Sequence, residues 1–178
     1  MDAPQPFSDR EIAFLGALVA EGADFLVVGL AAAALQGAPA VTQDVDLWFR
    51  ALPDPGLMRA LAAVGASYLP PTASTPPLLA GAGTELFDVV VHMHGLESFA
   101  QEASRAVRIR LGRVEVPVLP LARIIASKQA AGRPKDLSIL PALEDTLRAR
   151  RAMSGAEGTG SWHAGVTSEP DGSPPRRS

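Results

Sequence analysis

The segment VVGLAAAALQGAPAVTQDVDLWF, residues 27–49, decides the fold class of this chain. It starts in an apolar β-branched run that Gly29 ends, continues through an alanine-rich stretch, and reaches Asp44 and Asp46 at a second apolar run. Because residues i and i+2 of a strand lie on the same face, both carboxylates are expected to point away from the core. Two unpaired carboxylates side by side repel each other, which predicts a cation between them.

Helical and strand patterns alternate along the whole chain. We expect helices at residues 9–21, 30–37, 54–64, 95–104, 120–131 and 134–153. Strands are expected at residues 24–28, 45–49, 66–69, 85–92, 106–111 and 114–119, with the proline-rich stretch 70–84 as a loop. This order predicts the α+β (mixed α/β) class, with a small mixed sheet flanked by helices and a helical C-terminus.

Local signals place several of these boundaries. Ser8 and Glu11 form an S-x-x-E capping box at the start of the first helix. Asp54 is expected to be the N-cap of the third helix, followed by Pro55 in its first turn. The dipeptide Gly112-Arg113 between two alternating runs predicts a hairpin with a two-residue turn.

Composition divides the chain into one domain, residues 1–153, and a disordered tail, residues 154–178. Of the 25 residues in that tail, 15 are Gly, Ser, Pro or Thr, and large apolar side chains are almost absent. Such a segment cannot bury enough apolar surface to offset the entropy lost on ordering. The preceding 153 residues are long enough for one hydrophobic core.

The overall composition excludes some classes of protein. The formal net charge is −3, which does not indicate a nucleic-acid binder, and the chain lacks cysteine, which excludes disulfides and thiolate metal sites. The N-terminus has no basic region followed by an apolar one, and no apolar run has the length of about 18 residues needed for a membrane span. We therefore expect a cytoplasmic protein without a membrane partner.

A third acid, Asp88, lies inside the β-branched run 87–91. If that strand pairs with the strand after Asp44, the three carboxylates of Asp44, Asp46 and Asp88 form one cluster. Carboxylate oxygens are ligands for Mg²⁺, and such a cluster can hold two ions about 4 Å apart for attack at phosphorus. The alternative is that the two neighbouring acids only mark an exposed strand end.

These residues resemble a known family. Gly29-Leu30, followed after thirteen residues by Asp44-Val45-Asp46-Leu47, is similar to the hG[GS]-x(9–13)-Dh[DE]h signature of nucleotidyltransferases with the DNA-polymerase-β-like fold. Asp88 stands where that family has its third carboxylate. Residues 116–140 resemble the helical segment of its small bacterial branch, which includes AbiEii-like and minimal (MNT-type) nucleotidyltransferases, often found in toxin–antitoxin systems. The resemblance covers residues 24–147.

The resemblance implies transfer of a nucleoside monophosphate from an NTP to a hydroxyl of an acceptor, which would be RNA, a protein or a small molecule. Asp44, Asp46 and Asp88 would bind Mg²⁺ in a two-metal site, and Asp88 would also activate the acceptor hydroxyl. The residues assigned to nucleotide binding are Gly29, Leu30, Thr42, Lys128, Arg133 and Lys135. A cognate toxin or antitoxin is a further expected partner.

Two departures from the family pattern leave a second interpretation open. Leu30 replaces a small residue where phosphate approaches the backbone, and Ala40 stands where relatives often have arginine. The chain would then be a catalytically weak or inactive member that acts as a nucleotide-binding or antitoxin-like partner.

Further polar residues have two interpretations each. Asp136 either complements a helix dipole or belongs to the site, and His92 and His94 either end a strand or contact a ligand. Arg108 and Arg110 share one strand face, which suits either nucleic acid or solvent.

Overall fold

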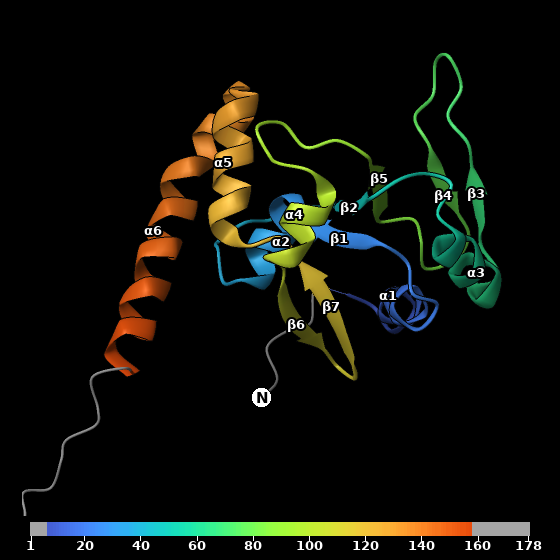
Figure 1. Ribbon diagram of the computed structural model, residues 1–178, viewed down its shortest axis with the longest axis horizontal. Coiled ribbons are helices and arrows are strands. Elements are labelled where there is room, and N and C mark those ends of the chain that lie inside the picture. Colours follow the sequence, from blue (N-terminus) through green and yellow to red (C-terminus); the bar gives the residue numbers. More distant parts are fainter. Residues whose placement is uncertain (1–6, 158–178) are drawn as a thin grey trace, which may run out of the picture.

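The computed structural model describes residues 7–157, which form a mixed α+β domain (Figure 1). The helices are α1 (Asp9–Ala20), α2 (Gly29–Leu35), α3 (Pro55–Val64), α4 (Phe99–Ser104), α5 (Leu121–Ala131) and α6 (Pro134–Glu157). The strands are β1 (Phe25–Val28), β2 (Val45–Phe49), β3 (Ser67–Leu69), β4 (Leu78–Ala80), β5 (Phe87–Val90), β6 (Val107–Leu111) and β7 (Val114–Val118). The predicted α+β class is confirmed.

A five-stranded sheet in the order β5-β2-β1-β7-β6 forms the centre of the domain. Its central strand β1 is antiparallel to β2 and parallel to β7, and β2 is parallel to β5. All four residues of β1 are buried, which explains why this strand is a continuous apolar run instead of an alternating one. In β2 the buried residues Val45 and Leu47 flank the half-buried Asp46, so the predicted alternation is confirmed at this point.

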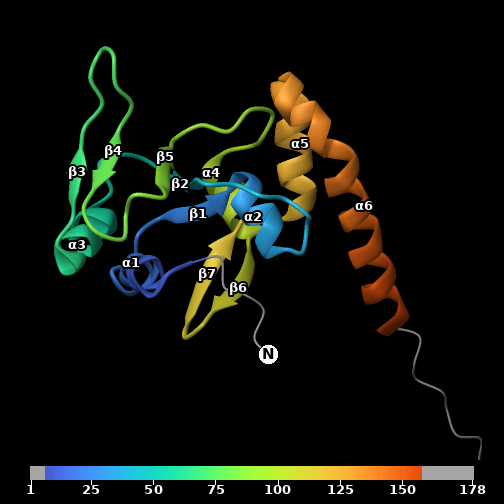
Figure 2. The same ribbon diagram turned by 180° about the vertical axis from the view of Figure 1, so that it is seen from behind.

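Helices α1, α2 and α4 lie near the central strands, between two outer groups of elements (Figures 1 and 2). Helices α5 and α6 pack against each other at one end, and α3 with the separate β3–β4 hairpin lies at the other. Within residues 7–157 no helix is long and apolar enough to cross a membrane.

Most helix boundaries follow the local signals. Ser8 and Glu11 form the predicted capping box of α1, and Asp54 accepts a hydrogen bond from the backbone N–H of Leu57 at the start of α3. Helix α3 ends at Gly65, which adopts a left-handed conformation with φ 71°. A left-handed residue after the last helical turn is a position where glycine avoids a steric penalty.

Several predicted boundaries are wrong: α4 begins at Phe99 and not at residue 95, and β5 is shorter than the expected strand 85–92. The stretch 70–84 was expected to be a loop, but Leu78–Ala80 forms strand β4, antiparallel to β3. Strand β4 has only three residues, which is too short for its sequence to predict a strand. It forms because it pairs with β3, where Leu79 is buried opposite Tyr68. Helix α6 continues to Glu157, so residues 154–157 of the predicted disordered tail are helical. The remainder of that tail, residues 158–178, lies outside the described residues.

The buried side chain of Gln36 joins α2 to the second half of the sheet. Its amide nitrogen donates to the carbonyl oxygens of Ala32 and Leu119, each at 2.9 Å, and its oxygen accepts from the backbone N–H of Leu121 at 2.9 Å. Gln36 is 3% exposed, so these backbone groups have little access to water as a substitute partner. The residue therefore fixes the β7–α5 junction against α2.

We predict that Gln36→Met lowers the free energy of unfolding by about 3 kcal/mol, because it leaves a buried carbonyl and a buried N–H without partners. Urea denaturation followed by circular dichroism measures this change. Gln43→Met is the matched control, since Gln43 is exposed. Equal stability of the two variants would contradict the role assigned to Gln36.

Candidate functional site

One pocket contains every residue that the sequence analysis assigned to metal or nucleotide binding. Its volume is about 330 Å³, and its lining residues are Gly29, Leu30, Thr42, Asp44, Asp46, Asp88, Lys128, Arg133, Lys135 and Asp136. They come from the β1–α2 turn, the segment before β2, strands β2 and β5, and helices α5 and α6. The fold thus brings together residues that are up to 107 positions apart, from Gly29 to Asp136. We call this pocket the carboxylate pocket.

The three carboxylates lie on one wall of this pocket because of the strand register. Strands β2 and β5 are parallel, and Asp46 is the register partner of Asp88. Asp44 directly precedes β2 and is exposed, as is Asp88, whereas Asp46 is half-buried. The expectation that the strand of Asp88 pairs with that of Asp46 is therefore confirmed.

Gly29 makes close contact between the β1–α2 turn and β2 possible. Its φ is +68°, a left-handed value that disfavours any side chain. A β-carbon at this position would also overlap the Oδ2 atom of Asp46. Position 29 is thus restricted to glycine by backbone conformation and by the neighbouring carboxylate.

Asp46 lies in an unfavourable electrostatic environment. Burial raises the pKa of its carboxyl, and the negative charges of Asp88 and Asp44 raise this pKa further. The positive charges of Lys128 and Lys135 lower it, but the net direction is upward. Ionised Asp46 therefore costs folding free energy that an added cation would recover.

Asp136 holds the basic residues of the opposite wall. Its carboxylate is 2% exposed and accepts from Lys128 Nζ at 2.8 Å and from Arg133 Nε at 2.6 Å. Burial alone would raise the pKa of Asp136, but these two charged hydrogen bonds outweigh it and hold the pKa below its usual range. Asp136 lies in the first turn of α6, as its dipole interpretation expects, and it also lines the pocket as the counter-ion of Lys128 and Arg133, so both interpretations stand.

Thr42 and Leu30 shape the rim of the carboxylate pocket. The hydroxyl of Thr42 donates to the carbonyl oxygen of Asp44 at 3.0 Å and accepts from its backbone N–H at 3.3 Å, so Thr42 fixes a turn immediately before β2. Leu30 is half-buried in the wall where the family pattern has a small residue. Ala40 lines a different, apolar pocket.

The acidic wall has donors of the chemical type that hard divalent cations bind. Carboxylate oxygens are the ligands that Mg²⁺ takes in proteins, and burial, followed by the charges of Asp88 and Asp44, raises the pKa of Asp46. Among the described residues 7–157, however, no three His, Cys, Asp or Glu side chains are grouped closely enough to hold a metal ion, and this includes Asp44, Asp46 and Asp88.

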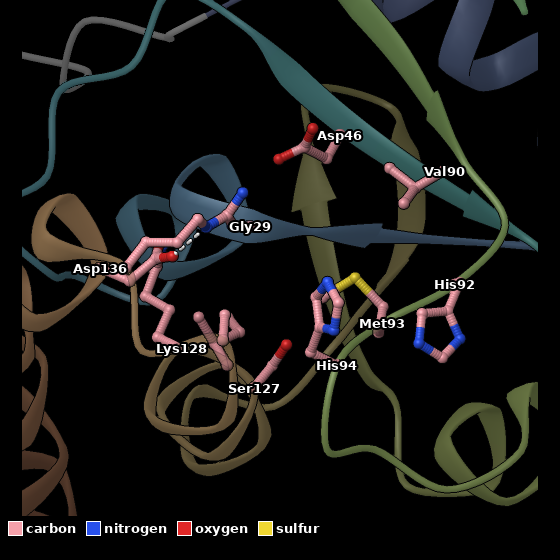
Figure 3. A pocket seen from close by; sticks show the side chains of 12 residues that line it. Gly29, Asp46, Val90, His92, Met93, His94, Ser127, Lys128 and Asp136 are labelled. Carbon is pink, nitrogen blue, oxygen red and sulfur yellow. Dashed lines mark hydrogen bonds and ion pairs between the residues drawn. The ribbon is translucent and has the colours of Figure 1, made fainter. Parts of the chain in front are cut away.

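A second pocket, of about 270 Å³, adjoins the first and contains residues that the sequence analysis did not select (Figure 3). It includes His92 and His94, which the sequence left open, together with Met93 and Ser127. The sequence signal for these histidines is their even spacing after Asp88, which would place all three residues on one face of an extended strand. Ser127 had no sequence signal, because its burial depends on packing between α5 and its neighbours. We call this the histidine pocket.

The basic strand residues do not join either pocket. Arg108 lines a separate pocket together with Asp24 and Phe25, and Arg110 forms an exposed ion pair with Glu115 at 3.3 Å. The positions of Arg108 and Arg110 relative to the two pockets therefore do not support a role in binding nucleic acid.

Comparison with known proteins identifies no relative of this chain. No family model matches the chain, and no characterised protein is significantly similar to it. The nucleotidyltransferase resemblance therefore stays a prediction from motif residues and their spacing.

We predict that Asp136→Asn lowers the free energy of unfolding by about 3 kcal/mol at neutral pH, because Lys128 then remains buried without its counter-ion. The pKa of Asp136 is lowered by folding, so its contribution is present above the ordinary Asp pKa and is lost as the pH falls through the folded-state pKa. Denaturant titrations at several pH values measure both effects. The control Asp145→Asn, in an exposed pair with Arg148, should change stability by about 0.5 kcal/mol or less.

Asp46→Asn should have the opposite effect and raise the melting temperature at pH 7. Folding raises the pKa of Asp46, so the wild-type protein loses stability as the pH rises past the ordinary Asp pKa of about 3.9, and the loss is complete above the folded-state pKa. The variant does not lose this stability, so its melting temperature should rise by about 3 °C for each kcal/mol of unfolding free energy that it recovers. Thermal denaturation should show the gain disappearing in acid. A lower melting temperature at every pH would refute this account.

Proposed function

We propose that this chain is a Mg²⁺-dependent nucleotidyltransferase that moves a nucleoside monophosphate from an NTP to a hydroxyl of an acceptor. One observation carries the proposal: all nine residues that we expected from the sequence to bind metal or nucleotide line a single pocket. Most chance matches to a spaced motif would leave such residues on separate faces of the molecule. The register pairing of Asp46 with Asp88 supports the same reading.

The distribution of charge in the carboxylate pocket suits a metal–triphosphate complex. The acidic wall consists of Asp44, Asp46 and Asp88, and the basic wall consists of Lys128, Arg133 and Lys135. Asp44, Asp46 and Asp88 would hold Mg²⁺, which when bound neutralises phosphate oxygens and favours in-line displacement. The exposed ammonium group of Lys135 is well placed at the rim for a phosphate.

The chain's own side chains have defined parts in such a transfer. Gly29 leaves the space that a side chain would take and keeps the Asp46 carboxylate against the turn. The acceptor oxygen would bond to the α-phosphorus, its proton would pass to a carboxylate oxygen of Asp88, and pyrophosphate would leave beside the basic wall. Asp88 is exposed, so an acceptor hydroxyl can reach it.

The acceptor and the biological setting follow only from the resemblance. RNA, a protein and a small molecule are the three acceptor classes it implies. A toxin–antitoxin or phage-defence role, with a cognate partner protein, is part of the same proposal.

A second candidate is a nucleotide-binding protein without transfer activity. Leu30 favours it, because this half-buried side chain lines the wall where a small residue would let phosphate approach the backbone. This candidate shares nucleotide binding with the first and differs only in turnover.

We predict that incubation with α-labelled NTPs, Mg²⁺ and an extract containing RNA and protein labels an acceptor. Labelling should fall at least about a hundredfold in Asp44→Asn and Asp46→Asn, because each removes a charge from the acidic wall. Chelation of Mg²⁺ with EDTA should have the same effect. Gel electrophoresis and thin-layer chromatography detect labelled macromolecules and small molecules respectively.

Asp145→Asn is the matched control, since Asp145 is an exposed acid on α6 outside the pocket, and it should label like the wild type. Binding of NTP without any transfer would support the second candidate. Absence of both binding and transfer would refute both.

A further inference from the structure

The histidine pocket adjoins the carboxylate pocket. Both are lined by Gly29, Asp46, Lys128, Arg133 and Asp136. In Figure 3, Asp46 lies across the histidine pocket from Lys128 and Ser127, and Met93 and His94 form a side wall. A ligand whose charged end occupies the carboxylate pocket can therefore extend past Asp46 into the histidine pocket.

The chemistry of the lining changes across this shared boundary. Beyond it lie Val90, His92, Met93, His94, Ile124 and Ser127, none of which has a carboxylate, ammonium or guanidinium group. The two cations at the boundary, Lys128 and Arg133, are already paired with Asp136. The histidine pocket thus suits an uncharged, ring-containing group with polar edges more than it suits a phosphate.

The side wall of this pocket is fixed to α5. Gly95, at φ +65°, lies so close to Ala130 that a β-carbon at position 95 would overlap the Ala130 side chain. Two residues later, the backbone N–H of Glu97 donates to Glu102 Oε1 at 3.1 Å. The segment that follows β5 is therefore held at two points, and the pocket exists before a ligand enters.

Glu102 makes the second attachment rigid. This carboxylate is fully buried and accepts from Arg123 of α5 through Nε at 2.9 Å and Nη2 at 2.5 Å. The hydrogen bond from Arg123 is the main reason that the pKa of Glu102 is lowered. Helices α4 and α5 are thereby joined directly behind the wall that carries His94.

We propose that the histidine pocket binds the nucleoside part of the NTP, with the base stacked on the imidazole ring of His94 and a polar edge hydrogen-bonded to the Ser127 hydroxyl. Bases stack on histidine as on other aromatic rings, and stacking on one side chain contributes about tenfold or more in affinity. The inference rests on the proposed function, because it assumes a triphosphate in the carboxylate pocket. The chain should then bind an NTP more tightly than it binds inorganic tripolyphosphate.

Isothermal titration of the full chain in Mg²⁺ tests this with two sets of probes, inorganic tripolyphosphate and the four NTPs. The wild type should bind at least one NTP about tenfold more tightly than tripolyphosphate. His94→Ala should lose most of that difference and leave tripolyphosphate affinity unchanged, whereas His94→Phe should keep it, because phenylalanine retains a stacking surface. Ser127→Val should reduce the affinity for the preferred NTP only.

Ser67→Val, in the β3–β4 hairpin and outside both pockets, is the control and should bind all probes like the wild type. Equal affinity of the wild type for NTPs and tripolyphosphate would overturn the inference and leave the proposed function standing. The inference would also be overturned if both His94→Ala and Ser127→Val kept the full difference in affinity between NTPs and tripolyphosphate. The histidine pocket would then be free for the acceptor. Failure to bind either probe would overturn the inference together with the proposed function.

Discussion

The contact between the Asp46 carboxylate and the α-carbon of Gly29 is the constraint on which the site depends. It requires a residue without a side chain at the end of β1, and the left-handed conformation of Gly29 turns the chain directly into α2. It also places a half-buried acid next to two others, Asp44 and Asp88, at an electrostatic cost.

The two walls of the carboxylate pocket solve the problem of charge burial in opposite ways. Asp136 is almost fully buried but has two cationic partners, so its ionised form is favoured. Burial of Asp46, and after it the like charges of Asp88 and Asp44, disfavour its ionised form. Lys128 and Arg133 of the basic wall therefore have a counter-ion in Asp136, whereas the acidic wall consists of three carboxylates.

Features set by short-range patterns could be predicted from the sequence. The bounds of β2 and α3, the Ser8 cap and the nine pocket residues follow from alternation, capping chemistry or motif spacing. Features set by contacts between distant segments could not. Strand β4 exists through pairing with β3, and Ser127 enters the histidine pocket through the packing of α5. The ion pair of Glu102 with Arg123 likewise joins helices whose relative position no local pattern specifies.

The order of strands in the sheet also has a consequence for synthesis of the chain. Strand β1 has β2 on one side and β7 on the other, and β7 is made about ninety residues after β1. During translation, β1, β2 and β5 can associate first, while the far edge of β1 stays open and the Gln36 amide lacks its partners at the β7–α5 junction. Completion of the nascent domain therefore awaits residues 114–121, and a ribosome that stalls before them exposes an unpaired apolar strand.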